Sequence, residues 1–161
     1  MARNPATAAG DRYCEYDAAA GVEYVERNSG ASKTVSVVAR ETLEMSKLHE
    51  DMLINCAEDD VGLWEFVWAA NGGGYIEVSQ QVRDKAISLV RDLLEAGPIQ
   101  AQDYLEGRGW EIWQLPVDLA LERINCEWDV LGHTPNLGDI AFFTATEKGR
   151  QKAREMLANR Q

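Results

Sequence analysis

Residues 140–157, Ile-Ala-Phe-Phe-Thr-Ala-Thr-Glu-Lys-Gly-Arg-Gln-Lys-Ala-Arg-Glu-Met-Leu, join an apolar segment directly to a charged one. The apolar part ends at Ala145 and is typical of a strand. Thr146 is a good helix N-cap, because its hydroxyl can accept a hydrogen bond from an amide of the first turn. Glu147 lies just inside that turn and suits the positive end of the helix dipole. The stretch therefore predicts a strand, Asp139–Ala145, followed at once by a final helix.

The rest of the chain divides into shorter apolar segments whose spacing indicates helices or strands. Gly97 and Pro98 end one helical segment, and Pro116 suits the first turn of the next. Helices are expected at 41–57, 61–70, 79–96 and 117–131. Strands are expected at 75–78, 99–104 and 110–115.

The strand, the Thr-x-x-Gly-Arg sequence of Thr146–Arg150 and the following helix resemble the junction between the wing and the last helix of winged helix-turn-helix proteins. The expected order of elements also matches that family: three helices, two strands and a final helix. The resemblance implies an α+β fold, with a winged-helix-like three-helix core, a small antiparallel sheet and a C-terminal helix. Trp110–Leu131 adds a strand and a helix, inserted between the two wing strands.

The domain organisation follows from where helical periodicity begins. Residues 1–40 lack it and are expected to form an N-terminal appendage, partly disordered or folded as a short hairpin. Residues 41–161 are expected to form the winged-helix-like domain. Within it Leu121–Trp128, with Gly132, Pro135 and Gly138, resembles uncharacterised actinobacterial proteins. That likeness implies no activity.

Composition limits the classes of partner. The chain has 16 basic and 27 acidic residues and a formal net charge of −11. This balance repels nucleic-acid phosphates and suits a basic protein partner. No apolar run reaches the roughly 18 residues that a membrane span needs, and the N-terminus lacks a signal-peptide core. We therefore expect a cytoplasmic protein without membrane contact, whose three scattered cysteines are reduced.

Metal, cofactor and catalytic motifs are weak. His49 and Cys56 are seven positions apart, as are Cys126 and His133. Seven residues of helix span about 10.5 Å, too far for two ligands of one ion. Gly30–Thr34 lacks both glycines of a Walker A loop. With two histidines and no converging triad, we expect no metal, no cofactor and no enzymatic activity.

The five tryptophans suggest a contact surface, because tryptophan is enriched at interface hot spots. Trp110 and Trp113 are expected on opposite faces of one strand, so that at least one is exposed. Together with Trp128 they are the predicted partner-binding residues. The final helix is a plausible homodimer contact, since the last helices of winged-helix proteins often serve this way. The favoured function is thus a non-enzymatic protein-interaction or regulatory domain.

The alternative is a DNA-binding transcriptional regulator. In a helix-turn-helix, the first residues of the recognition helix face base edges. Here the helix that starts near Ser79 would present Gln80, Gln81, Arg83 and Lys85. Glutamine and arginine are suited to read adenine and guanine. The acidic balance of the chain argues against this alternative, because the expected basic footprint is missing.

Overall fold

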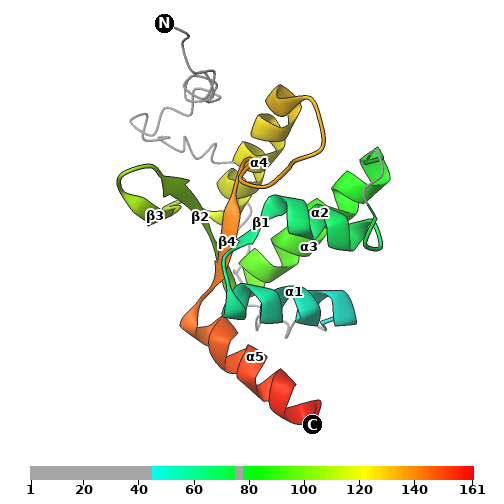
Figure 1. The fold of residues 1–161 in the computed structure, drawn as a ribbon, viewed down its shortest axis with the longest axis vertical. Helices are drawn as coiled ribbons and strands as arrows, with labels where there is room; N and C mark the ends of the chain where they lie inside the picture. Colours follow the sequence, from blue (N-terminus) through cyan, green and yellow to red (C-terminus); the bar gives the residue numbers. More distant parts are fainter. Residues whose placement is uncertain (1–44, 75–77) are drawn as a thin grey trace, which may run out of the picture. The chain divides into compact units, whose positions relative to one another are not determined.

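The computed structural model describes residues 45–74 and 78–161. By its internal contacts the chain divides into residues 1–42 and 43–161, and only the second unit is described below. The appendage and hairpin predicted for residues 1–40 lie outside the described residues, as does most of the strand predicted at 75–78. In chain order the elements are α1 (Lys47–Glu58), β1 (Val61–Gly62), α2 (Leu63–Ala70), α3 (Gln80–Ala96), β2 (Ile99–Leu105), β3 (Gly109–Ile112), α4 (Val117–Leu131), β4 (Phe142–Ala145) and α5 (Glu147–Asn159) (Figure 1).

The described elements form a mixed α+β fold with five helices and an open, antiparallel four-stranded sheet. The strand order is β1-β4-β2-β3. In the register of the sheet, Ala101 lies opposite Phe143 and Tyr104 lies opposite Trp110. β3 is an edge strand, so β2 and β4 remain neighbours although β3 and α4 lie between them in sequence. Figure 1 shows the β2–β3 hairpin extending away from the helices.

One face of the sheet forms part of the core. Ile99, Ala101, Phe143 and Ala145 alternate with outward-facing residues on β2 and β4, and each is at most 5% exposed. The ring of Phe143 meets that of Phe66 in α2 edge to face, with 5.0 Å between ring centroids. The helices add further fully buried side chains to this core: Leu53, Leu63, Val90, Leu93 and Ile124. This face is called the inner face below.

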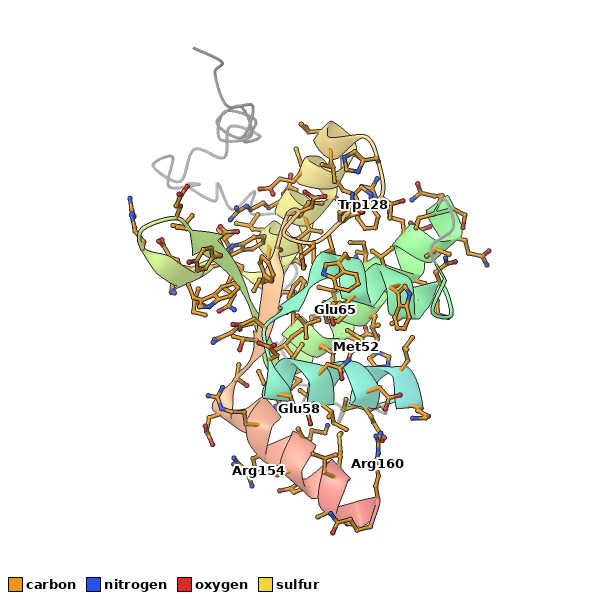
Figure 2. The ribbon with its side chains drawn as sticks, viewed as in Figure 1. Met52, Glu58, Glu65, Trp128, Arg154 and Arg160 are labelled. Carbon is orange, nitrogen blue, oxygen red and sulfur yellow. The ribbon has the colours of Figure 1, made fainter. Side chains whose placement is uncertain are left out.

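The junction between strand and final helix forms as predicted. The Thr146 hydroxyl accepts a hydrogen bond from the Gly149 amide at 3.1 Å and donates one to the Gly97 carbonyl at 2.8 Å. A side chain at Gly149 would collide with the carbonyl oxygen of Pro98. Glycine therefore allows α5 to approach the start of β2 closely. At its far end α5 is tied to α1, because Arg160 pairs with Glu50 and Asp51 (Figure 2).

Four predicted boundaries are wrong. α1 begins at Lys47, because Ser46 is extended and caps the helix; residues 41–44 of the helix predicted at 41–57 lie outside the described residues. Val61–Gly62, predicted as helix, pairs with β4 as a short strand. The strand predicted at 110–115 ends at Ile112. β4 starts only at Phe142, since Ile140 has a φ of 70° that interrupts extended backbone. By contrast, α4 has the predicted bounds and ends at Gly132, whose φ is 72°.

Candidate functional site

The outward face of the sheet carries a row of aromatic rings. Tyr104 on β2 and Trp110 on β3 form a cross-strand pair with 5.1 Å between ring centroids. The Trp110 ring also meets Phe142 on β4 edge to face at 5.0 Å, and so reaches across β2. Tyr104 is 61% exposed and Trp110 is 45% exposed. Aromatic side chains are therefore displayed over three neighbouring strands.

Trp64 extends this row over β1. Gly62 lies opposite Phe142, and a Cβ atom added to it would lie 2.6 Å from Cδ1 of Trp64 and 3.8 Å from the Phe142 ring. The absent side chain of Gly62 thus leaves the space that the Trp64 indole fills. The buried indole N–H of Trp64 has no acceptor in the described part of the chain. Below, "aromatic row" means Trp64, Phe142, Trp110 and Tyr104.

A buried glutamine connects the aromatic row to a group of carboxylates. Gln102 alternates outward on β2 between Gln100 and Tyr104, yet it is only 2% exposed. Its side-chain amide donates a hydrogen bond to the carboxylate of Asp60 at 2.6 Å. Because Gln102 lies opposite Phe142, Asp60 is held on the same face as the aromatic rings.

Next to Asp60 the surface forms a hollow of about 250 Å³. Its charged lining consists of Glu58, Asp59, Asp60 and Arg150, and Thr144 of β4 contributes the sheet side. Arg150 already bonds to the Glu147 carboxylate at 3.2 Å and to the Ala145 carbonyl at 2.6 Å. We call this the acidic hollow. Figure 2 shows Glu58 at the end of α1.

The carboxylates of the acidic hollow lie where a helix disfavours them. α1 ends at Glu58, and its last turn holds no basic residue. Helix C-termini carry partial negative charge, so cations rather than anions are stabilising there. Nearby, burial raises the pKa of Glu65, and the charge of Asp59 raises it further. The lining of the hollow therefore has three carboxylates and one guanidinium, and so carries net negative charge.

The three predicted partner-binding tryptophans do not share one surface. Trp110 is exposed, whereas Trp113 packs against the core beneath the Arg123 guanidinium, 3.9 Å above its ring. Trp128 is only 5% exposed, and Arg83 lies 4.8 Å from its ring centroid. Trp113 and Trp128 thus take part in the packing of α4 against the rest of the domain. Alternation along the strand predicted at 110–115 separates Trp110 from Trp113, although β3 ends at Ile112, but it does not reveal which face the helices cover.

The four residues predicted to read DNA also differ in their surroundings. The Arg83 guanidinium donates to the Asp129 carboxylate at 2.7 Å and to the Asn125 carbonyl at 3.0 Å. Its side chain is only 18% exposed, because it joins α3 to α4. Gln80 donates to Asp84 at 2.7 Å. Gln81 and Lys85 are exposed. A polar hollow of about 320 Å³ lies at this end of α3, lined in part by Arg83 and His133.

Ser46, His49 and Asp92 form a chain of hydrogen bonds. The Ser46 hydroxyl lies 2.6 Å from Nδ1 of His49, and Nε2 of His49 lies 2.9 Å from the Asp92 carboxylate. The arrangement contains the residue types of a catalytic triad. Ser46 also accepts from the His49 amide as the N-cap of α1, and neither described hollow is lined by these residues. Capping and a tie between α1 and α3 account for all three side chains.

The cysteines differ from one another. Cys56 is a free, buried thiol, and burial raises its pKa, which makes it a poor nucleophile. Cys126 is disulfide-bonded, so the expectation of reduced thiols is wrong for this residue. Among the described residues no three His, Cys, Asp or Glu side chains are placed so that they could hold a metal ion together. In the same residues no helix is long and apolar enough to cross a membrane.

Comparison with known proteins adds no relative. No protein-family model matches the chain, and neither the curated proteins nor the solved structures give a significant match.

Proposed function

We propose that residues 41–161 form a winged-helix-like domain that associates with another protein and has no catalytic role. Three helices precede β2, and α5 follows β4 immediately, as in the expected order. The direct pairing of β2 with β4 supports this assignment, because these two strands would form the wing. β3 and α4 are then an insertion that widens the sheet and covers α3.

The observation that carries the proposed function is the exposure of the aromatic row. Tyr104 and Trp110 present large rings to solvent on a sheet face, next to Phe142. Contiguous exposed apolar surface of this kind marks interaction sites, and tryptophan and tyrosine dominate interface energetics. Each ring is held by its neighbour, so little side-chain entropy remains to be lost on binding. The aromatic row is therefore the protein-binding surface.

Site-specific crosslinking tests this assignment. Tyr104 is replaced by a photo-crosslinking phenylalanine analogue, and the full chain is irradiated in its native lysate. We expect a discrete crosslinked protein, lost when Trp110→Ala is added. The matched control is Trp68→Ala, since Trp68 on α2 is 43% exposed but is not among the described rings that contact Trp110. Undiminished crosslinking in the Trp110→Ala protein would reject the aromatic row as the binding site.

The DNA-binding alternative depends on the first turns of α3. Gln81 and Lys85 are exposed there, but Arg83 is bound to α4 and would have to exchange its contacts for a base. We therefore expect no binding of labelled duplex DNA in anisotropy titrations, even at about 50 mM salt, where phosphate contacts are strongest. Binding that weakens steeply toward about 200 mM salt, and that Lys85→Ala reduces, would restore the regulator function.

Dimerisation through the C-terminal helix remains a separate prediction. Gly149 and Ala153 of α5 are buried in the domain itself, whereas Leu157 is 40% exposed. A homodimer through this helix would need Leu157 at its centre. Sedimentation equilibrium of the wild-type chain and of Leu157→Glu tests it. Loss of a dimer only in the variant supports the contact, and a monomer in both rejects it.

A further inference from the structure

We infer that the partner binds the sheet through a basic segment, with its side chains over the aromatic row and a lysine or arginine in the acidic hollow. This inference rests on the proposed protein-binding function and specifies the chemistry of the partner. Three features of the surface support it. The aromatic row and the acidic hollow are continuous, the hollow has more carboxylates than basic groups, and the Trp110 ring has an exposed side.

The aromatic row and the acidic hollow belong to one continuous surface. Gln102 lies opposite Phe142, and the outward residue two positions earlier, Gln100, lies opposite Thr144. Thr144 lines the hollow, and the Gln102 amide holds Asp60 of the hollow at 2.6 Å. Strand neighbours are only about 4.8 Å apart. A short extended peptide can therefore contact both features at once.

The charge of the hollow calls for a cation. Glu58, Asp59 and Asp60 follow one another at the negative end of α1, where no basic residue offsets them within the last turn. Arg150 is the basic residue of the lining, and its guanidinium is already bound to Glu147 and Ala145. A lysine or arginine from the partner would balance a lining that has three carboxylates and one guanidinium. It would also interact favourably with the end of the helix dipole.

The rings favour the same class of side chain. Inside the domain, Arg123 lies over Trp113 and Arg83 lies over Trp128. Both pairs have the geometry of a cation–π contact, which stabilises by about 0.5–2 kcal/mol. In the part of the chain that the structure describes, Trp110 contacts only other aromatic rings at this range. Its exposed side is thus open to an arginine or lysine from outside.

Other occupants fit the charge less well. A second copy of this chain also carries a net charge of −11, so pairing two such surfaces would bring like charges together. A nucleic acid would bring phosphates against the same carboxylates. A basic protein segment is the remaining partner class that complements both the rings and the carboxylates.

The probe is a fluorescein-labelled peptide that alternates arginine with leucine, and its control replaces each arginine with glutamate. Anisotropy is measured with the full chain, Trp110→Ala, and a double variant, Glu58→Gln with Asp59→Asn. Both substituted carboxylates are exposed, so the fold should tolerate their neutralisation. The matched control is Glu95→Gln with Glu122→Gln, which removes the same charge from exposed positions on α3 and α4.

We expect the arginine peptide to bind the wild-type chain and the glutamate peptide not to bind. The Kd should rise at least about tenfold in the Glu58/Asp59 variant and in Trp110→Ala, which corresponds to about 1.4 kcal/mol. The Glu95/Glu122 variant should bind almost as well as wild type. Equal weakening in both double variants would mean attraction by net charge alone and would overturn the inference.

The two proposals can fail separately. If Tyr104 crosslinks a protein in a Trp110-dependent manner but the Glu58/Asp59 variant binds that protein and the peptide normally, the aromatic row binds a partner without a cation in the acidic hollow, and the inference is overturned while the proposed function stands. If no Trp110-dependent crosslink forms, the proposed function itself fails. Circular dichroism and unfolding of each variant distinguish loss of binding from loss of folding.

Discussion

The two faces of the same sheet have aromatic residues in adjacent positions with opposite roles. Phe143 on the inner face is fully buried against Phe66, whereas its neighbour Phe142 meets the exposed Trp110. A strand alternates its side chains between faces, so one peptide step separates a core residue from a surface residue. The helices cover the inner face. What distinguishes the outer face is that it keeps equally large rings without an equivalent cover in the described residues.

This difference is not expected of a sheet whose two faces serve folding alone. A sheet face that only needs to be soluble is usually polar. Here Tyr104 and Trp110 remain exposed, while the polar Gln102, two positions before Tyr104 on β2, is buried and bonded to Asp60. The inner face therefore accounts for stability, and the outer face is the place to look for binding. The following predictions test that division.

The largest effect should come from truncating the inner face. Phe143→Ala should lower the free energy of unfolding by about 3–5 kcal/mol, because it removes a fully buried ring and leaves a cavity. Phe142→Ala should cost less than half as much, since its ring is partly exposed. Urea unfolding of both variants measures the difference. Equal losses would show that the outer face is part of the core.

A second test concerns the approach of α5 to the sheet. Gly149→Ala places a Cβ atom against the Pro98 carbonyl oxygen, so α5 must shift and the domain should lose about 1–3 kcal/mol. Gln151→Ala on the exposed side of α5 is the control and should change stability little. Thermal unfolding followed by circular dichroism measures both. An unaltered melting temperature for Gly149→Ala would contradict the close packing described here.

A third test separates a structural arginine from a DNA-reading one. Arg83→Ala should destabilise the domain by about 1.5–3 kcal/mol, because it removes charged hydrogen bonds that join α3 to α4. Lys85→Ala, two positions further along α3 and exposed, should have almost no effect. Chemical unfolding of the two variants measures this. If Arg83→Ala is as stable as wild type, the guanidinium is available for another role.

The smallest effect should be a pH dependence at Glu65. Burial raises its pKa above the ordinary value of 4.5, so the folded state holds the proton more tightly than the unfolded state. The resulting stability is present at low pH and declines as the pH rises through the folded-state pKa. Glu65→Gln should therefore be slightly more stable than wild type near pH 7 and equal to it near about pH 3. A stabilisation that persists unchanged at about pH 3 would contradict this cause.

Local chemistry made much of the fold predictable from sequence. Pro116 and Gly132 bracket α4, and Thr146 opens α5, because each residue acts on the backbone within one turn. β1 could not be predicted, because a strand of two residues is too short to show an alternating pattern of apolar side chains. Val61–Gly62 is identified as a strand by its pairing with β4. Ser46 is a good cap inside an apparently helical stretch, and that signal could have placed the start of α1.

The candidate site was less predictable. Alternation along the predicted strand 110–115 separates Trp110 from Trp113, but exposure depends on where the helices pack in three dimensions. Likewise, Arg83 has the right residue type and position to read a base, and only the fold reveals its contacts with α4. Asp60 and Gln102 lie 42 positions apart, so their bond leaves no trace in sequence spacing.

The most direct test of the binding face is fluorine NMR of the full chain labelled with 5-fluorotryptophan. Five resonances are expected from the five tryptophans, and single Trp→Phe variants assign them. On titration with the arginine–leucine peptide, the account predicts that Trp110 shifts, with a smaller change at Trp64, while Trp68 and Trp128 stay in place. A shift confined to Trp68 or Trp128, with Trp110 unchanged at saturation, would contradict the assignment of the outer face as the binding surface.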